Sequence, residues 1–245
     1  MLISANALSR IYGVFPQGVV HVGAHQGEEY QDYVDQDWGH IYWIEANPVL
    51  CEQLRTRFNV SECTVVEAAV WSESGVKLNF NIASNGQSSS LLQFGTHLSD
   101  YPEIYFNRRI EIETRTLREL LPSKCDANFL NLDIQGAELN AIIGLGSRLS
   151  QFNWIFTEVN KKEVYTGCPN VTELDDYLNK FGFKRQATRW EVGKGWGDAL
   201  YARESQKNSF FSFLSVVLFY LPRYFQYWKY VLRGFIRKIK NNGSN

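Results

Sequence analysis

The chain has few cysteines and almost no net charge. Its four cysteines are widely spaced over 245 residues and form no C-x-x-C pair, which argues against a zinc ribbon and against a small disulfide-stabilised scaffold. The net charge of −1 provides no overall positive field for nucleic acid. We therefore expect free, mostly buried thiols in a reducing compartment and no nucleic-acid partner.

The sequence also lacks signals for export and for crossing a membrane. The N-terminal stretch MLISANALSRIYG is too polar for a secretory signal. The uncharged run Phe210–Leu221 is shorter than the ~20 residues that a spanning helix needs. A cytoplasmic location is the expectation that follows.

The end of the chain differs in composition from the rest. Seven of the 25 Lys and Arg residues lie within residues 205–245, which contain no Asp or Glu and many aromatic residues. Aromatic rings mixed with cations are typical of the bilayer interface. The sequence therefore predicts one domain over residues 1–204 and a helical tail over 205–245. For residues 209–240 we expect peripheral contact with the cytoplasmic face of a membrane; packing on the domain or in a homodimer is the alternative.

What the sequence does contain is an alternation of strands and helices. Apolar runs bounded by turn residues indicate strands, and segments with helical periodicity follow most of them. This order predicts an α/β fold with a doubly wound, mostly parallel sheet. The segments 183–192 and 197–203 are typical of a closing antiparallel pair of strands. The helix expected at 170–183 precedes this pair, and Thr172 is its expected N-cap. The other expected strands are 18–24, 40–46, 63–70, 76–82, 108–117, 127–134 and 152–159, and the expected helices are 2–12, 28–37, 48–58, 136–149 and 170–183.

A turn with two glycines follows the first expected strand. Gly23 and Gly27 have the spacing G-x-x-x-G, so the dinucleotide fingerprint G-x-G-x-x-G is not met. Glycines here allow close approach of a ligand, and the next helix presents free N–H groups. His21 and His25 flank Gly23, but the zinc motif H-E-x-x-H is absent, and we expect no metal ion. The turn is either a ligand-binding loop or a simple connection.

Acidic residues lie at the ends of three expected strands. Glu45 follows Gly23 by 22 residues, where an acid can accept hydrogen bonds from the ribose hydroxyls of an adenosine ligand, with Asn47 close by. Asp133 and Glu158 end two later strands. Because the carboxyl ends of parallel strands meet at one edge of a sheet, both are expected in one crevice, as a general base and its partner or around a cation.

The order of these motifs resembles the FkbM family of S-adenosylmethionine-dependent methyltransferases. The resemblance covers about residues 16–203 and rests on HVGAHQGEE, WIEANP, VEAAVWSESGVKLNF, SSSLL, IEIETRTLREL, NFLNLDIQGAEL, FTEVNKKEVYTG and LNKFGF, in that order. It implies a class I methyltransferase fold, with a mostly parallel seven-stranded sheet and an antiparallel last strand. It also implies methyl transfer from S-adenosylmethionine to a hydroxyl, usually of a sugar, polyketide or other secreted or surface glycan.

The resemblance further implies roles for individual residues of this chain. Glu45 would bind the ribose of the cofactor, residues 67–68 would lie near its adenine, and residues 88–90 would form a loop over the cofactor or the acceptor. Asp133 would face the transferred methyl group and Glu158 the acceptor. The residues implied to bind S-adenosylmethionine are His21, Gly23, Ala24, Gly27, Glu45, Ala46, Asn47, Glu67, Ala68, Ser89 and Asp133.

Two motifs depart from the commoner family pattern. Where that pattern has D-V-G-A-N and K-x-D-x-E-G, this chain has HVGAH and NLDIQG. We expect a histidine-bearing H-x-G-A-H branch, in which the polar network has been exchanged as a set. The catalytic base is therefore open between His25, Asp133 and Glu158.

Two other functions are compatible with parts of the sequence. An NAD-dependent sugar oxidoreductase is disfavoured because both G-x-G-x-x-G and a Y-x-x-x-K catalytic spacing are missing. A non-catalytic nucleotide-binding or membrane-associated protein is disfavoured by the acids at the strand ends. The sequence thus predicts an O-methyltransferase acting on a small-molecule or glycan acceptor.

Overall fold

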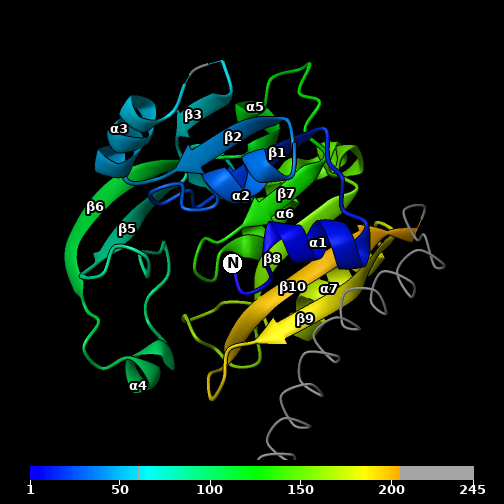
Figure 1. Cartoon of the computed structure of the whole chain (residues 1–245). Coiled ribbons are helices and arrows are strands. Elements are labelled where there is room, and N and C mark those ends of the chain that lie inside the picture. The colour runs from blue at the N-terminus through cyan, green and yellow to red at the C-terminus, as the bar shows by residue number, and fades with distance from the viewer. Residues whose placement is uncertain (60, 205–245) are drawn as a thin grey trace, which may run out of the picture. The chain divides into compact units, whose positions relative to one another are not determined.

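The computed structural model of the protein describes residues 1–59 and 61–204 (Figure 1). Residues 1–5 and 15–204 belong to one compact unit, which contains both sheets. Helix α1 (Ala5–Tyr12) falls almost entirely in a second unit and is taken by itself. The predictions for the tail at 205–245 lie outside the described residues. Within the described part, no helix has the length and apolar character needed to cross a membrane.

The main sheet has seven strands in the order β3-β2-β1-β7-β8-β10-β9. Neighbouring strands are parallel except where β10 is involved, because β10 runs antiparallel to both β8 and β9. The predicted parallel sheet with an antiparallel last strand is confirmed, and so is the closing pair. The strands are β1 (Gly18–Val22), β2 (His40–Glu45), β3 (Cys63–Glu67), β7 (Phe129–Leu132), β8 (Trp154–Asn160), β9 (Phe183–Trp190) and β10 (Trp196–Arg203).

Alternate residues of β1 enter two different cores. Val20 and Val22 belong to an aliphatic core to which α6 and α7 contribute. His21 lies on the opposite face, where its ring centroid is 5.0 Å from that of Trp43 and 6.0 Å from that of Tyr33 in α2. Helices therefore cover both faces of the sheet. They are α2 (Tyr30–Asp35), α3 (Pro48–Arg57), α5 (Leu117–Leu120), α6 (Glu138–Leu145) and α7 (Val171–Asn179), with a 3₁₀ turn at Gly146–Gln151.

A second, three-stranded sheet lies beside the first, in the order β4-β6-β5. Its strands are β4 (Ala69–Val70), β5 (Lys77–Ala83) and β6 (Phe106–Arg115). The single strand predicted at 63–70 is wrong, because the chain leaves the main sheet at Ala68 and β4 pairs with β6 instead. The segment between β5 and β6, residues 84–105, carries the short helix α4 (His97–Asp100), which the sequence did not predict. Figure 1 shows the bent β5–β6 pair with α4 near its end.

The start of α7 corrects a second prediction. Asn170, not Thr172, is the N-cap: its side-chain oxygen accepts hydrogen bonds from the backbone N–H groups of Thr172 (2.9 Å) and Glu173 (3.1 Å). Glu173 in turn accepts from the backbone N–H of Asn170 at 2.8 Å. This reciprocal capping box satisfies N–H groups that would otherwise lack partners in the first turn.

Candidate active site

Two adjoining pockets open at the carboxyl ends of the parallel strands. The apolar pocket encloses about 580 Å³ of empty space and the acidic pocket about 1210 Å³, both counted out to open solvent. The apolar pocket is lined mainly by Val22, Ile44, Ala46, Leu50, Ala68, Ala69, Val70, Phe80, Leu91, Ile134 and Ala137, together with Glu45, Asn47 and Ser89. The acidic pocket is lined by Met1, His21, Ala24, Glu28, Glu29, Asn85, Ser88, His97, Tyr101, Ile104, Gln135, Glu158, Val164, Tyr165 and Trp196. The two pockets share Gly23, His25, Gln87 and Asp133.

Gly23 brings two strand ends together at the junction of the pockets. Its φ is +82°, and a Cβ there would lie 1.8 Å from the carbonyl oxygen of Asp133. The backbone N–H of Asp133 also donates to Val22 at 3.0 Å. Only glycine fits this approach, so the turn after β1 and the turn after β7 are held in register. Ala24, the next residue, lines the acidic pocket.

Gly27, which the resemblance implies in cofactor binding, does not line either pocket. A Cβ at Gly27 would lie 2.5 Å from the ring of Phe58, so packing explains the missing side chain. Glu67 also lies outside both pockets and pairs with Arg55 at 3.5 Å. Ala68, one residue later, lines the apolar pocket, since successive side chains point to opposite sides of an extended chain.

Glu45 is buried at the edge of the apolar pocket, with both carboxylate oxygens in use. One oxygen accepts from the backbone N–H of His25 at 2.9 Å, and the other from that of Asn47 at 2.8 Å. Burial raises the pKa of Glu45, and these hydrogen bonds oppose that rise. The carboxylate is thus rigidly held, with lone pairs left to accept further hydrogen bonds. Asn47 uses its side chain to cap α3 by accepting from Val49 at 3.1 Å.

His25 lines both pockets and occupies an unusual backbone conformation. Its φ of +46° is uncommon for a residue other than glycine, and such positions tend to occur at functional sites. The ring Nδ1 lies 2.6 Å from a carboxylate oxygen of Glu28, which is largely exposed. His25 is therefore fixed at the junction by its backbone and by its ring.

A network of four side chains connects the junction to the far wall of the acidic pocket. The amide Nε2 of Gln135 donates to Asp133 at 2.6 Å and to Glu158 at 3.1 Å. Tyr165 donates its hydroxyl to Oε1 of Gln135 at 2.6 Å, which fixes the orientation of the amide. Gln135 has a φ of +56°, so its backbone also takes the left-handed conformation. A neutral amide thereby holds two carboxyl groups that would otherwise repel each other.

The two carboxyl groups differ in environment. Asp133 is accessible from the pocket, although protein surrounds it, and this burial raises its pKa. Glu158 is only 8% exposed, and burial followed by repulsion from Glu138, Asp133 and Asp198 raises its pKa well above the ordinary value. The protonated form of Glu158 is favoured, while Asp133 is the accessible acceptor of protons. A difference in accessibility and surroundings of this kind gives two neighbouring acids different roles.

Glu138 has a structural role next to this network. Its carboxyl oxygen accepts from the backbone N–H groups of Ile134 (3.1 Å) and Gly136 (3.0 Å), which shapes the turn after β7. The side chain is fully buried, and burial raises its pKa to about 7.

Of the loop residues 88–90, one lines each pocket and the third lines neither. Ser89 lines the apolar pocket, while its hydroxyl donates to Gly86 at 2.6 Å and so shapes its own turn. Ser90 donates to the backbone oxygen of Gln135 at 2.8 Å. Ser88 lines the acidic pocket. The three hydroxyls mainly hold the loop in place.

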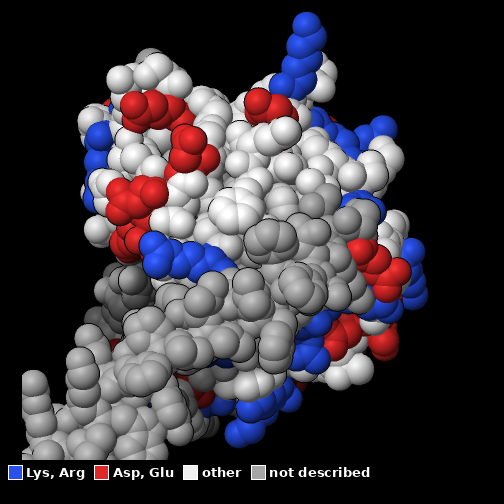
Figure 2. Space-filling model, turned by 45° about the vertical axis from the view of Figure 1, so that its right-hand side comes forward, with Lys and Arg blue, Asp and Glu red and all other residues white. Residues whose placement is uncertain are grey.

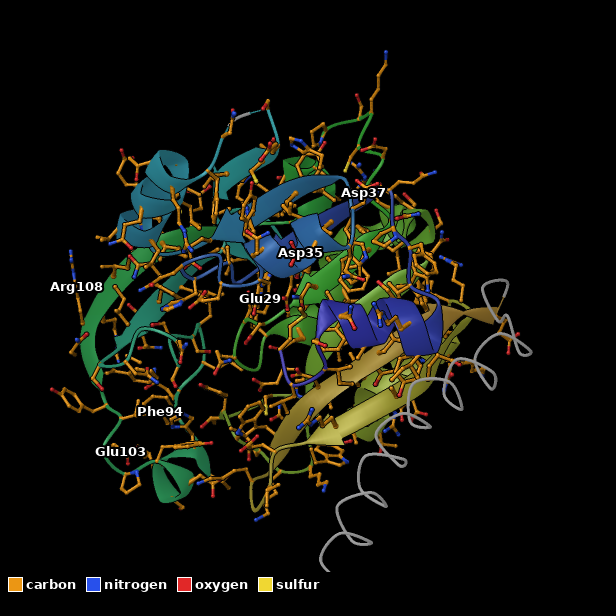
Figure 3. The ribbon with its side chains drawn as sticks, viewed as in Figure 1. Glu29, Asp35, Asp37, Phe94, Glu103 and Arg108 are labelled. Atoms are coloured by element: carbon orange, nitrogen blue, oxygen red, sulfur yellow. The ribbon has the colours of Figure 1, made fainter. Side chains whose placement is uncertain are left out.

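Several residues of the acidic pocket had no signal in the sequence. His97, Tyr101 and Ile104 come from the segment 84–105, whose strand and helix periodicity is weak, Tyr165 comes from the loop after β8, and Trp196 is the first residue of β10. His21 also lines this pocket and not the apolar one. In Figure 3, Phe94, whose ring stacks on His97 at 4.3 Å, lies beside α4, and Glu29 projects below α2. Within the described residues, no group of three or more His, Cys, Asp or Glu side chains could hold a metal ion.

The sheet order, the glycine turn after β1 and the buried acid at the end of β2 define a class I methyltransferase. The chain belongs to the FkbM methyltransferase family, since the model of the methyltransferase FkbM domain matches residues 21–185. The protein is therefore an S-adenosylmethionine-dependent methyltransferase, which sets aside the oxidoreductase and the non-catalytic alternatives.

Individual proteins are also similar to this chain. The chain is 25% identical over 188 residues to the 2-O-methyltransferase NoeI of Sinorhizobium fredii (strain NBRC 101917 / NGR234). The alignment covers 71% of this chain and 76% of that protein. Among solved structures, it is similar to M. capricolum TrmK in complex with S-adenosylhomocysteine (6% identity, TM-score 0.46, 80% of this chain and 67% of that one). It is also similar to the precorrin-6y C5,15-methyltransferase of Geobacter metallireducens GS-15 (16% identity, TM-score 0.43, 81% and 85%).

Proposed function

We propose that the protein transfers a methyl group to a hydroxyl of a sugar in a glycan or glycolipid. The observation that carries this proposal is the position of Asp133, which lines both the apolar and the acidic pocket. A side chain at such a junction can meet a cofactor from one side and an acceptor from the other. The 2-O-methyltransferase relative supports transfer to oxygen.

The apolar pocket fits S-adenosylmethionine. Glu45 would accept the ribose hydroxyls, Ala46 and Ala68 would contact the adenine, and the turn at Gly23 and Ala24 would lie beside the methionine end. The cofactor supplies an activated methyl group on a positively charged sulfur. Asp133 provides a negative charge at the same end of the pocket, which favours binding of that sulfonium.

The acidic pocket would hold the acceptor. A hydroxyl is a poor nucleophile, so its proton must be accepted as the oxygen attacks, and in-line alignment of that oxygen accounts for most of the remaining work. We assign the base to Asp133 because it is accessible and its pKa is raised. Gln135 and Glu158 position Asp133, and His25 closes the junction between the pockets.

Asp133→Asn tests this assignment. We expect the turnover number to fall by at least ~100-fold, the usual contribution of a general base, while calorimetry still detects binding of S-adenosylmethionine. Asp126→Asn, an exposed change in a loop outside both pockets, is the matched control. Activity is read as a gain of one methyl mass in a mass-spectrometric screen of glycosides. Full turnover by Asp133→Asn would remove Asp133 as the base, and a screen in which only non-sugar acceptors gain methyl groups would contradict the sugar assignment.

A further inference from the structure

Three histidines line the acidic pocket, and two of them, His21 and His97, form a hydrogen bond with a hydroxyl group. His21 is held by Tyr33, whose hydroxyl lies 3.1 Å from its Nδ1. His97 is held by Ser88, whose hydroxyl lies 3.2 Å from its Nε2. Both imidazoles are almost fully buried, at 2% and 4% exposure, which lowers both pKa values and keeps the rings neutral. A neutral imidazole carries one proton, so the position of that proton decides what each ring offers to a ligand.

The surroundings of His21 determine where its proton is. The amide nitrogen of Asn131 donates to the hydroxyl of Tyr33 at 2.8 Å and also faces Nδ1 of His21 at 3.3 Å. Since this hydroxyl accepts from Asn131, we assign it as the donor to Nδ1 of His21. The proton of His21 is therefore on Nε2. Among the described residues, none forms a hydrogen bond with that nitrogen.

His97 is hydrogen-bonded in a similar way, through Ser88 to the side-chain amide of Asn85. The backbone of Ser88 fixes the orientation of that amide. The side-chain oxygen of Asn85 accepts from the backbone N–H of Ser88 at 3.1 Å, so its nitrogen must be the atom that donates to the Ser88 hydroxyl at 3.0 Å. We assign that hydroxyl, which accepts from Asn85, as the donor to Nε2 of His97. The proton of His97 is on Nδ1, and this nitrogen is buried without a partner among the described residues. Buried donors without partners are rare and need an explanation.

We propose that His21 and His97 recognise the acceptor by donating hydrogen bonds to two of its oxygen atoms. The inference rests on the sugar methyltransferase function proposed above and extends it to acceptor selection. Asp133, on the wall of the same pocket, accepts a proton, so the pocket combines imidazole N–H donors with an acidic acceptor. A neutral, polyhydroxylated ring satisfies both kinds of group. No Lys or Arg side chain lines the pocket among the described residues, and the N-terminal ammonium of Met1, which does line it, is paired with Glu29 at 3.3 Å, so an acceptor bearing a carboxylate or phosphate would have to compete with Glu29 for that cation.

The protonation of the rings can be measured without any acceptor. The chain has four histidines, so two-bond ¹H–¹⁵N correlation spectra, assigned by single His→Gln variants, resolve each ring. We expect the Nε2–H form for His21 and the Nδ1–H form for His97. In Tyr33→Phe, His21 should become a mixture of both forms, whereas Tyr30→Phe, which removes a hydroxyl bonded to Glu62 outside the pocket, should leave it unchanged. Nδ1–H on His21 in the unaltered protein would overturn the inference.

The second readout is steady-state kinetics with a glycoside that the enzyme methylates. His21→Leu should raise KM for the acceptor by about tenfold, the equivalent of ~1.4 kcal/mol, and leave the calorimetric Kd for S-adenosylmethionine within about twofold. His21→Gln keeps a donor N–H near the position of Nε2 and should recover part of the loss. A change in cofactor Kd with an unchanged acceptor KM would show that His21 serves the cofactor. Because the spectra need no acceptor, a wrong tautomer and a failure to methylate any sugar are separate results.

Discussion

At the scale of single residues, two glutamates at neighbouring strand ends show what decides a role. Glu45 and Glu67 are paired in register between β2 and β3, yet only Glu45 lines the apolar pocket. Glu45 is held by two backbone N–H groups, whereas Glu67 is exposed and pairs with Arg55. Identical side chains one strand apart therefore provide a test and its control.

Glu45→Ala should weaken binding of S-adenosylmethionine by more than tenfold, because the acceptors for the ribose hydroxyls are lost, at a cost of ~1.4 kcal/mol or more. Isothermal titration calorimetry measures this directly. Glu67→Ala removes the same group outside the pocket and should change Kd by less than about twofold. Thermal melting of both variants separates a binding effect from loss of folding, and equal losses of affinity would contradict the assignment of Glu45.

Glu138 makes a prediction about stability and pH. Its folded pKa of about 7 lies above the ordinary 4.5, so the folded protein holds a proton that the unfolded chain releases. The stabilisation is present below pH 4.5 and is lost as pH rises towards and through 7. Glu138→Gln keeps an oxygen for Ile134 and Gly136 and removes the ionisation, so it should stabilise the protein at pH 8 by ~1–3 kcal/mol.

Urea unfolding at pH 5 and pH 8 measures this effect. Glu103→Gln, at an exposed residue next to α4 in Figure 3, is the control and should have the same stability as the unaltered protein at both pH values. If Glu138→Gln were less stable than the unaltered protein at pH 8, a charged Glu138 would be contributing to the fold.

At the scale of elements, the sequence predicted the strands of the main sheet and the acids at their ends. Both signals are local, because apolar runs mark buried strands and parallel strands place their carboxyl ends at one edge. The departure of the chain at Ala68 and the pairing of β4 with β6 depend on partners far along the sequence, which periodicity does not encode. His97 lies in the segment between β5 and β6, and Tyr165, after β8, pairs with Phe94 of the same segment, so both reach the pocket through contacts distant in the sequence and their roles were missed.

The cap of α7 gives a prediction at this scale. Asn170→Ala removes acceptors for two backbone N–H groups, so it should lower the free energy of unfolding by ~1 kcal/mol. Thr172→Ala, two residues later and exposed, should change it by less than ~0.5 kcal/mol. Urea unfolding with a common m-value compares them. If Thr172→Ala lowered the free energy of unfolding more than Asn170→Ala does, Thr172 would be the N-cap.

At the scale of the whole molecule, charge is unevenly distributed along the chain but mixed on the surface. Figure 2 shows acidic and basic side chains interspersed over the described part of the face it presents. Residues 205–245 contain seven Lys and Arg residues and no Asp or Glu, so we expect attraction to an anionic surface to come mainly from that segment of the sequence.

We therefore propose that the full chain binds anionic vesicles through residues 209–240. Reversal of Arg237, Lys238 and Lys240 to Glu should reduce co-sedimentation with phosphatidylserine-containing vesicles by at least about tenfold, since each cation near such a surface contributes ~1 kcal/mol. Reversal of Lys124, Lys162 and Lys180, which are exposed on the domain, changes net charge equally and is the control. Equal binding of both variants would exclude the membrane proposal.

The contact between His21 and Asn131 limits the mutational paths open to this sequence. The two residues are register partners on adjacent strands, at the positions where the commoner family pattern has Asp and Lys. Replacing either one alone would leave a buried charge unpaired, at a cost of ~3–5 kcal/mol, which is a large share of a typical stability. A lineage could pass between the neutral and the charged pair only through a nearly simultaneous double change, so the two sequence branches are expected to be separated by few viable intermediates.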